Sequence, residues 1–176
     1  MRVDINCLTI GAAVTERKRL VAWDDPAVGA AAMPSMSGLE YLHSMMGKRL
    51  PPPPMGELLN MTLVEAAPGT ATFTCHPDES HYNPIGAVHG GLVCTLLDSA
   101  LGCAVQTTLP KGVGYTSIEI KVNYLRSVRA GSGPLTCVGV VSKAGSRVAF
   151  ADGTVTDASG KLVATATGSL LVFPLS

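Results

Sequence analysis

The sequence carries no excess of charge of either sign. Thirteen lysines and arginines balance thirteen aspartates and glutamates, so the formal net charge is zero and the pI is 6.9. Nucleic acids and anionic membranes bind proteins through a positive field, so neither is an expected partner of this chain. Charged residues make up only 15% of the sequence, against about 25% in typical soluble domains. A surface so short of charge favours burial against a second copy of the chain.

The sequence also lacks the patterns that are typical of metal sites, membrane helices and signal peptides. The five cysteines contain no CxxC pair, so their spacing predicts no metal site, and their odd number favours reduced thiols. No apolar run reaches the ~20 residues that a membrane helix needs. Asp4 and Asn6 near the N-terminus, and the charged run at 16–19, do not fit a signal peptide. We therefore expect a cytoplasmic protein with no metal and no bound cofactor.

The length of 176 residues is typical of a single domain. Residues 1–36 show no steady hydrophobic period and are predicted to form a partly irregular N-terminal arm, leaving residues 37–176 as the domain. Ser37 is a good N-cap for a short helix over 38–46, which Gly47 would end. The four prolines at 51–54 predict an extended spacer.

Alternating apolar and polar residues predict a series of strands separated by short turns. In the clearest one, alternation places Ile118, Ile120 and Val122 on one face and Ser117 on the other. Short turns between consecutive strands favour antiparallel pairing. The predicted strands cover residues 58–66, 70–76, 115–126, 135–142, 147–156 and 162–173.

One long helix is predicted over residues 90–108. Ten of the fourteen residues from 92 to 105 are Leu, Val, Ala or Cys, which is typical of a buried helix. Its exceptions recur every three or four residues and so form one narrow stripe: Thr95, Asp98, Ser99, Gly102 and Gln106. The sequence therefore predicts the α+β class, with a curved antiparallel sheet wrapped around one central helix.

The residues around the start of this helix could form a catalytic site. Free N–H groups at a helix start, with Gly90 and Gly91 allowing close approach and Asn83 adding an amide donor, can stabilise a developing negative charge. Asp98 could act as nucleophile or general base. Because an unpaired carboxylate in an apolar helix is costly, function is favoured over an incidental buried salt bridge.

Each of these residues also has a purely structural interpretation. The glycines could serve only a tight helix entry, Asn83 an ordinary turn, and His89 could be a capped core histidine. A serine hydrolase has little support, because the sequence lacks a GxSxG elbow.

The pattern Asn83-x-x-Gly86-x-x-His89-Gly90-Gly91, with Asp98 seven residues further on, resembles a known family. Together with GYTSIEIKVNYL at 114–125, it is similar to the hotdog-fold acyl-CoA thioesterases of the phenylacetate-degradation type, in the 4-hydroxybenzoyl-CoA thioesterase superfamily. The resemblance covers about residues 37–173. It implies a hotdog fold and homodimers that assemble into homotetramers.

The resemblance also implies a role for each catalytic candidate. Asp98 would be the nucleophile or base, and Gly90 and Asn83 would polarise the thioester carbonyl. His89 would hold Asn83 or its loop in place, and Ser117 would support Asp98 or its water.

Four further residues are expected to contact the substrate, acyl-CoA. They are Gly91 and Thr95 on the helix, and Arg126 and Arg129, which would contact the phosphates of coenzyme A. No part of the motif distinguishes one acyl group from another.

Spacing along the helix adds a prediction of its own. Gly90 and Asp98 are eight residues apart, or about 12 Å along a helix. An aspartate side chain cannot bridge that distance. Both residues can serve one thioester only if they come from different subunits.

The favoured function is hydrolysis of a medium-chain or aromatic acyl-CoA to the free acid and coenzyme A. One alternative is a non-catalytic acyl-CoA-binding or regulatory module, which an intact Asp98 disfavours. Another is an enoyl-CoA hydratase on the same architecture, which needs an Asp and a His close together at the helix entry. Asp98 lies two turns inside the helix, which argues against this enzyme.

Overall fold

The computed structural model describes residues 15–175. Its helical elements are α1 (Pro26–Ala32), the 3-10 turn η1 (Met33–Ser35), α2 (Gly38–Met46), α3 (Pro54–Leu59), the 3-10 turn η2 (Glu79–His81) and α4 (Gly90–Gln106). Its strands are β1 (Met61–Ala67), β2 (Thr70–Cys75), β3 (Val113–Tyr124), β4 (Leu135–Lys143), β5 (Val148–Thr156) and β6 (Leu162–Pro174). The strands form one antiparallel sheet in the order β1-β2-β4-β5-β6-β3.

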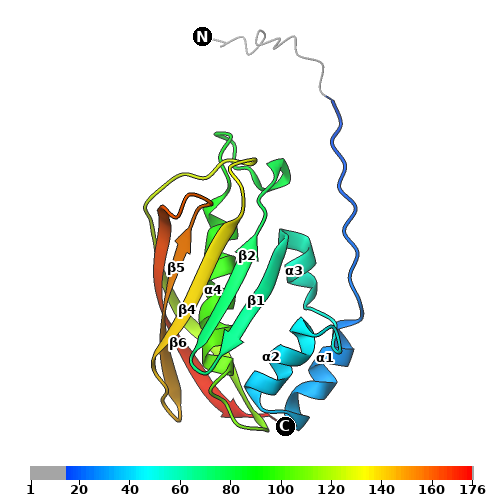
Figure 1. Cartoon of the computed structure of the whole chain (residues 1–176), viewed down its shortest axis with the longest axis vertical. Helices are drawn as coiled ribbons and strands as arrows, with labels where there is room; N and C mark the ends of the chain where they lie inside the picture. The colour runs from blue at the N-terminus through cyan, green and yellow to red at the C-terminus, as the bar shows by residue number, and fades with distance from the viewer. Residues whose placement is uncertain (1–14, 176) are drawn as a thin grey trace, which may run out of the picture.

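The sheet curves around α4, as Figure 1 shows. Leu96, Leu97 and Val105 are fully buried between the helix and the concave face. The helix approaches β4 so closely that a Cβ at Gly139 would lie 2.3 Å from the Ala100 carbonyl oxygen, so glycine is required there. This arrangement confirms the predicted α+β architecture with one central helix. No helix in the described part of the chain is both long and apolar enough to cross a membrane.

The short helices α1, α2 and α3 lie beside the β1 edge of the sheet (Figure 1). The predicted helix over 38–46 is confirmed as α2, with a capping box between Ser37 and Glu40 and with Gly47 at its end. Gly38 N donates to the Leu109 carbonyl at 3.0 Å, which fastens α2 to the end of α4.

The segment after the proline run differs from its prediction. It does not extend straight into a strand, because Pro54 begins the helix α3. Proline is well suited to the first position of a helix, where its fixed φ is already helical and its missing N–H costs nothing. Asn60 ends α3 in the left-handed conformation, at φ 52°, and β1 starts at Met61.

A β-bulge in β3 overturns the predicted facing of Ser117. The pairing of β3 with β6 shifts by one residue between Ser117 and Glu119, leaving Ile118 55% exposed. Because a bulge adds one residue to the strand, it reverses which residues face the helix. Ser117 therefore faces α4 before the bulge, and Ile120 and Val122 pack on the core after it.

One arginine fastens the extended segment before α1 to the rest of the molecule. The Arg19 guanidinium donates to Asn60 Oδ1 at 2.6 Å and to Ser80 Oγ at 3.2 Å, and it lies 3.6 Å from Asp78 Oδ2. It also lies 3.1 Å from His81 Nε2. These groups belong to the end of α3 and to the turn η2 with its N-cap, so Arg19 joins three parts of the chain.

We predict that Arg19→Ala lowers the free energy of unfolding by about 1–2 kcal/mol, because several hydrogen bonds to a charged group are lost together. Arg17→Ala is the matched control. Arg17 makes one ion pair with Glu79 between largely exposed side chains, and removing such a pair changes stability by less than ~1 kcal/mol. Urea unfolding followed by circular dichroism measures both variants. Equal losses from the two would contradict an anchoring role for Arg19.

Candidate active site

The loop before α4 is shaped by Asn83. Its side-chain Oδ1 accepts hydrogen bonds from Ile85 N and Ala87 N, both at 3.1 Å. The backbone N–H of Asn83 donates to the Ala87 carbonyl at 2.8 Å. Gly86 completes the turn at φ +75°, a conformation that favours glycine. The side-chain amide of Asn83 has no acceptor within residues 15–175. Asn83 therefore forms the turn through its oxygen and keeps its amide N–H groups available to a ligand.

The N-cap and the first two residues of α4 differ in their hydrogen bonding. His89 is the N-cap: its Nδ1 accepts from Gly91 N at 2.8 Å, and its backbone N–H donates to the His81 carbonyl at 2.8 Å. The Gly91 N–H is thus occupied, whereas the Gly90 N–H has no partner in the described chain. His89 holds the helix start and makes no hydrogen bond to the Asn83 side chain there.

Tyr124 covers Gly90 from β3. Its hydroxyl donates to the Gly90 carbonyl at 3.0 Å. A Cβ at Gly90 would lie only 3.2 Å from the Tyr124 ring, so glycine allows the strand to approach the helix start. Sequence reasoning placed Tyr124 in a strand but had no signal for this contact, which spans 34 residues of chain.

The Asp98 carboxylate is half-buried and held by Ser117, whose hydroxyl donates to Asp98 Oδ1 at 2.7 Å. None of the lysines, arginines and histidines in the described chain forms an ion pair with Asp98. The structure therefore offers no support for an incidental buried salt bridge. Asp98 keeps its second oxygen available for chemistry.

The candidate donors and the carboxylate open into two different hollows. Asn83, Gly90 and Tyr124 line a hollow of about 340 Å³. Asp98 and Ser117 line a cavity of about 1200 Å³. A single chain therefore brings together Asp98 with Ser117, and Asn83 with Gly90, but it does not join the two pairs.

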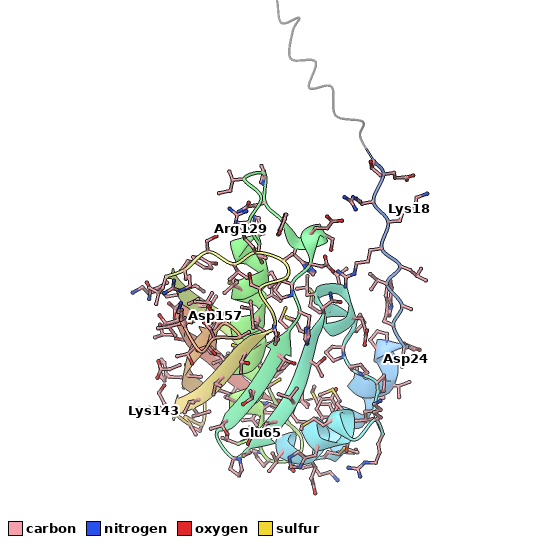
Figure 2. The ribbon with its side chains drawn as sticks, turned by 45° about the horizontal axis from the view of Figure 1, so that its top comes forward. Lys18, Asp24, Glu65, Arg129, Lys143 and Asp157 are labelled. Carbon is pink, nitrogen blue, oxygen red and sulfur yellow. The ribbon has the colours of Figure 1, made fainter. Side chains whose placement is uncertain are left out.

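The remaining residues expected to contact the substrate are Thr95, Arg126 and Arg129. The Thr95 hydroxyl donates to the Gly91 carbonyl one turn back in α4, at 2.9 Å. Arg126 lines the smaller hollow. Arg129, labelled in Figure 2 near the start of α4, donates to the Gly86 carbonyl at 3.2 Å and thereby braces the loop of Asn83.

Cys103 lines the same cavity as Asp98 and is a second potential nucleophile. Burial raises the pKa of its thiol to about 12, and the charge of Asp98 adds to the shift. The thiol therefore stays protonated at neutral pH, and a protonated thiol is a poor nucleophile. The Cys103 thiol is therefore poorly suited to attack, whereas a carboxylate such as Asp98 in the same cavity could attack or accept a proton.

The chain is similar in sequence and in fold to known proteins. Residues 85–164 match the thioesterase superfamily. Human acyl-coenzyme A thioesterase 13 is 34% identical over 105 residues, which cover 59% of this chain and 74% of the human protein. The mouse protein of the same name is 32% identical over 108 residues, covering 61% of this chain and 76% of that protein.

Solved structures show the same fold. A Streptococcus mutans protein bound to acetyl CoA is 28% identical, with a TM-score of 0.61 over 66% of this chain and 90% of that chain. The Escherichia coli PaaI protein from the phenylacetic acid degradation operon is 20% identical, with a TM-score of 0.69 over 80% of this chain and 97% of that chain, and supports the fold alone. With these likenesses the predicted hotdog fold is confirmed, and the chain belongs to the thioesterase superfamily.

Proposed function

We propose that this protein hydrolyses acyl-CoA thioesters to a free acid and coenzyme A, at sites formed between two subunits. The observation that carries the proposal is Asp98, held by Ser117 at the wall of a large cavity with no basic partner in the described chain. The human relative is named an acyl-coenzyme A thioesterase, and the Streptococcus mutans structure holds acetyl CoA, which supports this substrate class.

The edge strand β3 supports pairing with a second copy. It pairs only with β6 in the described chain, and Ile118 and Tyr124 on it and Leu125 directly after it are 55%, 55% and 57% exposed. A long edge strand with exposed apolar side chains tends to pair with another strand. Antiparallel pairing of β3 with its copy would continue the sheet, forming the homodimer; two such dimers would form the expected tetramer.

This pairing would also complete the active site. On β3, Ser117 contacts Asp98 and Tyr124 contacts Gly90. In an antiparallel pair centred on Lys121, residues that face the same side lie opposite each other, and the extra residue at Ile118 would bring Ser117 of one subunit opposite Tyr124 of the other. The carboxylate of one subunit would then face the helix start of its neighbour, which the separation of the two hollows in one chain requires.

In the assembled site, the thioester carbonyl oxygen accepts hydrogen bonds from the Gly90 N–H and the Asn83 amide. These donors stabilise the negative charge that develops on this oxygen during attack. Asp98 of the neighbouring subunit acts in one of two ways. It takes a proton from an attacking water and returns it to the departing sulfur, or it attacks the carbonyl carbon itself and the resulting anhydride is hydrolysed.

The alternative functions have weaker support. An enoyl-CoA hydratase needs a histidine beside the aspartate, but His89 caps the helix two turns from Asp98. A non-catalytic acyl-CoA-binding module would not need an unpaired carboxylate at the cavity wall.

The free thiols of Cys75, Cys94, Cys103 and Cys137 support a reducing compartment such as the cytoplasm.

We predict that Asp98→Asn lowers kcat by roughly 10²–10⁴, because the variant keeps the side-chain volume but loses the nucleophile or base. Ser117→Ala removes one supporting hydrogen bond and should cost about tenfold or less. Release of free thiol from acyl-CoA measures both, and retained binding of acyl-CoA shows that the fold survives. An Asp98→Asn enzyme with normal turnover would contradict the proposal, and a wild-type protein that releases no thiol would favour the binding module.

Mixing two inactive variants tests whether the site is shared. Asn83→Asp keeps the oxygen that shapes the loop but replaces the amide donor, so we expect kcat to fall by roughly 10²–10³. A mixed dimer of Asp98→Asn and Asn83→Asp subunits contains one site with both functional residues intact. Activity should therefore return after subunit exchange. If exchange is verified by differential labelling and no activity returns, the two residues do not serve one thioester from opposite subunits.

A further inference from the structure

We propose that the large cavity holds the acyl group and that the helices before β1 select flexible, linear acyl chains of medium length over short or aromatic ones. This inference rests on the proposed function, because it places the thioester at Asp98. It assigns a role to residues 26–59, which lie outside the stretch that matches the thioesterase superfamily.

The cavity begins at the candidate catalytic carboxylate and continues along α4. Asp98, Cys103 and Gln106 all line it. Eight residues separate the first from the last, which corresponds to about 12 Å along the helix. An acyl group whose carbonyl carbon lies at Asp98 therefore has room to extend along the helix, well beyond the reach of an acetyl group.

The lining of the cavity favours a flexible chain. Methionine is unbranched and polarizable, so methionine-lined surfaces adapt to ligands that take many conformations. Aromatic rings are few in this wall, which has Phe73 and Tyr115. Five methionines line the cavity, four of them from η1, α2 and α3: Met33, Met45, Met46, Met55 and Met61.

The charged residues that line the two hollows indicate which hollow holds the acyl group and which holds the nucleotide of coenzyme A. The phosphates of coenzyme A are repelled by acidic side chains and attracted by basic ones. The smaller hollow has Arg126 as its charged lining residue. The large cavity has more acidic than basic lining residues: Asp24, Asp25, Glu57 and Asp98 against Lys48 and Arg49. Figure 2 shows Asp24 where the extended segment reaches α1. The nucleotide therefore belongs with the smaller hollow and the apolar acyl chain with the larger.

Met46 offers a way to shorten the cavity without touching Asp98. It is the last residue of α2, is half-buried, and packs in the same cluster as Tyr41 and Leu42, with Cys103 of α4 nearby. Replacing it with tryptophan adds bulk to the wall beyond the carboxylate. Leu58→Trp is the matched control, since Leu58 lies on α3, is 48% exposed and does not line the cavity.

The experiment measures kcat/KM of the wild type and both variants for acetyl-, hexanoyl-, decanoyl-, palmitoyl- and phenylacetyl-CoA. We expect the wild type to prefer hexanoyl- or decanoyl-CoA. Met46→Trp should lower the ratio of decanoyl to acetyl kcat/KM at least ~10-fold, the low end of what one methylene contributes in a hydrophobic pocket. Leu58→Trp should leave this ratio within about twofold of wild type. A preference for acetyl- or phenylacetyl-CoA, or an unchanged ratio in Met46→Trp, would overturn the inference.

A second measurement separates this inference from the proposed function. The decyl thioether of coenzyme A has the alkyl chain but no carbonyl to hydrolyse, and calorimetry measures its affinity in each variant. If Met46→Trp weakens its binding at least ~10-fold relative to coenzyme A alone, the cavity holds the chain even if no thioester is hydrolysed. If the thioether binds no more tightly than coenzyme A to the wild type, the cavity does not hold the chain, whatever the catalytic activity.

Discussion

The packing of α4 against the concave face of the sheet is the constraint on which the rest of the structure depends. The helix is apolar on nearly every side, and it lies so close to β4 that only glycine fits at 139. The few polar residues of the helix cannot face this sheet without losing their hydrogen bonds to water. Asp98 therefore lies on the side that opens into the large cavity, and its position follows from the burial of the other faces.

The bulge in β3 links this helix to the edge of the sheet. Without the extra residue at Ile118, Ser117 could not face α4 on the same strand as Ile120 and Val122. The bulge thus allows one strand to contribute a hydrogen bond to the carboxylate and apolar packing to the core. It also exposes Ile118 on the outer edge, where a second copy of the strand is proposed to pair.

Under the proposed pairing of two chains, the two separate half-sites would give assembly a direct role in catalysis. The donors at the start of α4 are held by local interactions, namely the turn of Asn83 and the cap of His89. The carboxylate is held two turns further along. Because a rigid helix keeps these groups apart, activity would depend on the dimer, and the added helices beside β1 would tune what reaches the carboxylate.

Much of this organisation could be predicted from the amino-acid sequence, because it depends on local patterns. Helix α4 and its polar stripe, α2 with its cap, and five of the strands to within a few residues follow from periodicity and turn residues. The residues of the loop and helix start also stood out, since an aspartate in an apolar helix and two glycines at its entry are unusual on physical grounds alone. The resemblance to a family added their roles.

Only the tertiary structure decided how these pieces meet. Strict alternation of residues along β3 predicts that Ser117 faces away from the helix, whereas Ser117 contacts Asp98. The sequence of β3 does not reveal the bulge, because a bulge depends on pairing with the partner strand. The contact of Tyr124 with Gly90 and the anchoring of Arg19 join residues 34 or more positions apart, which no local pattern records. The methionine-lined cavity likewise exists only where α2, α3 and α4 converge. Local physics determined which elements form, and the packing of distant elements determined which side chains share a site.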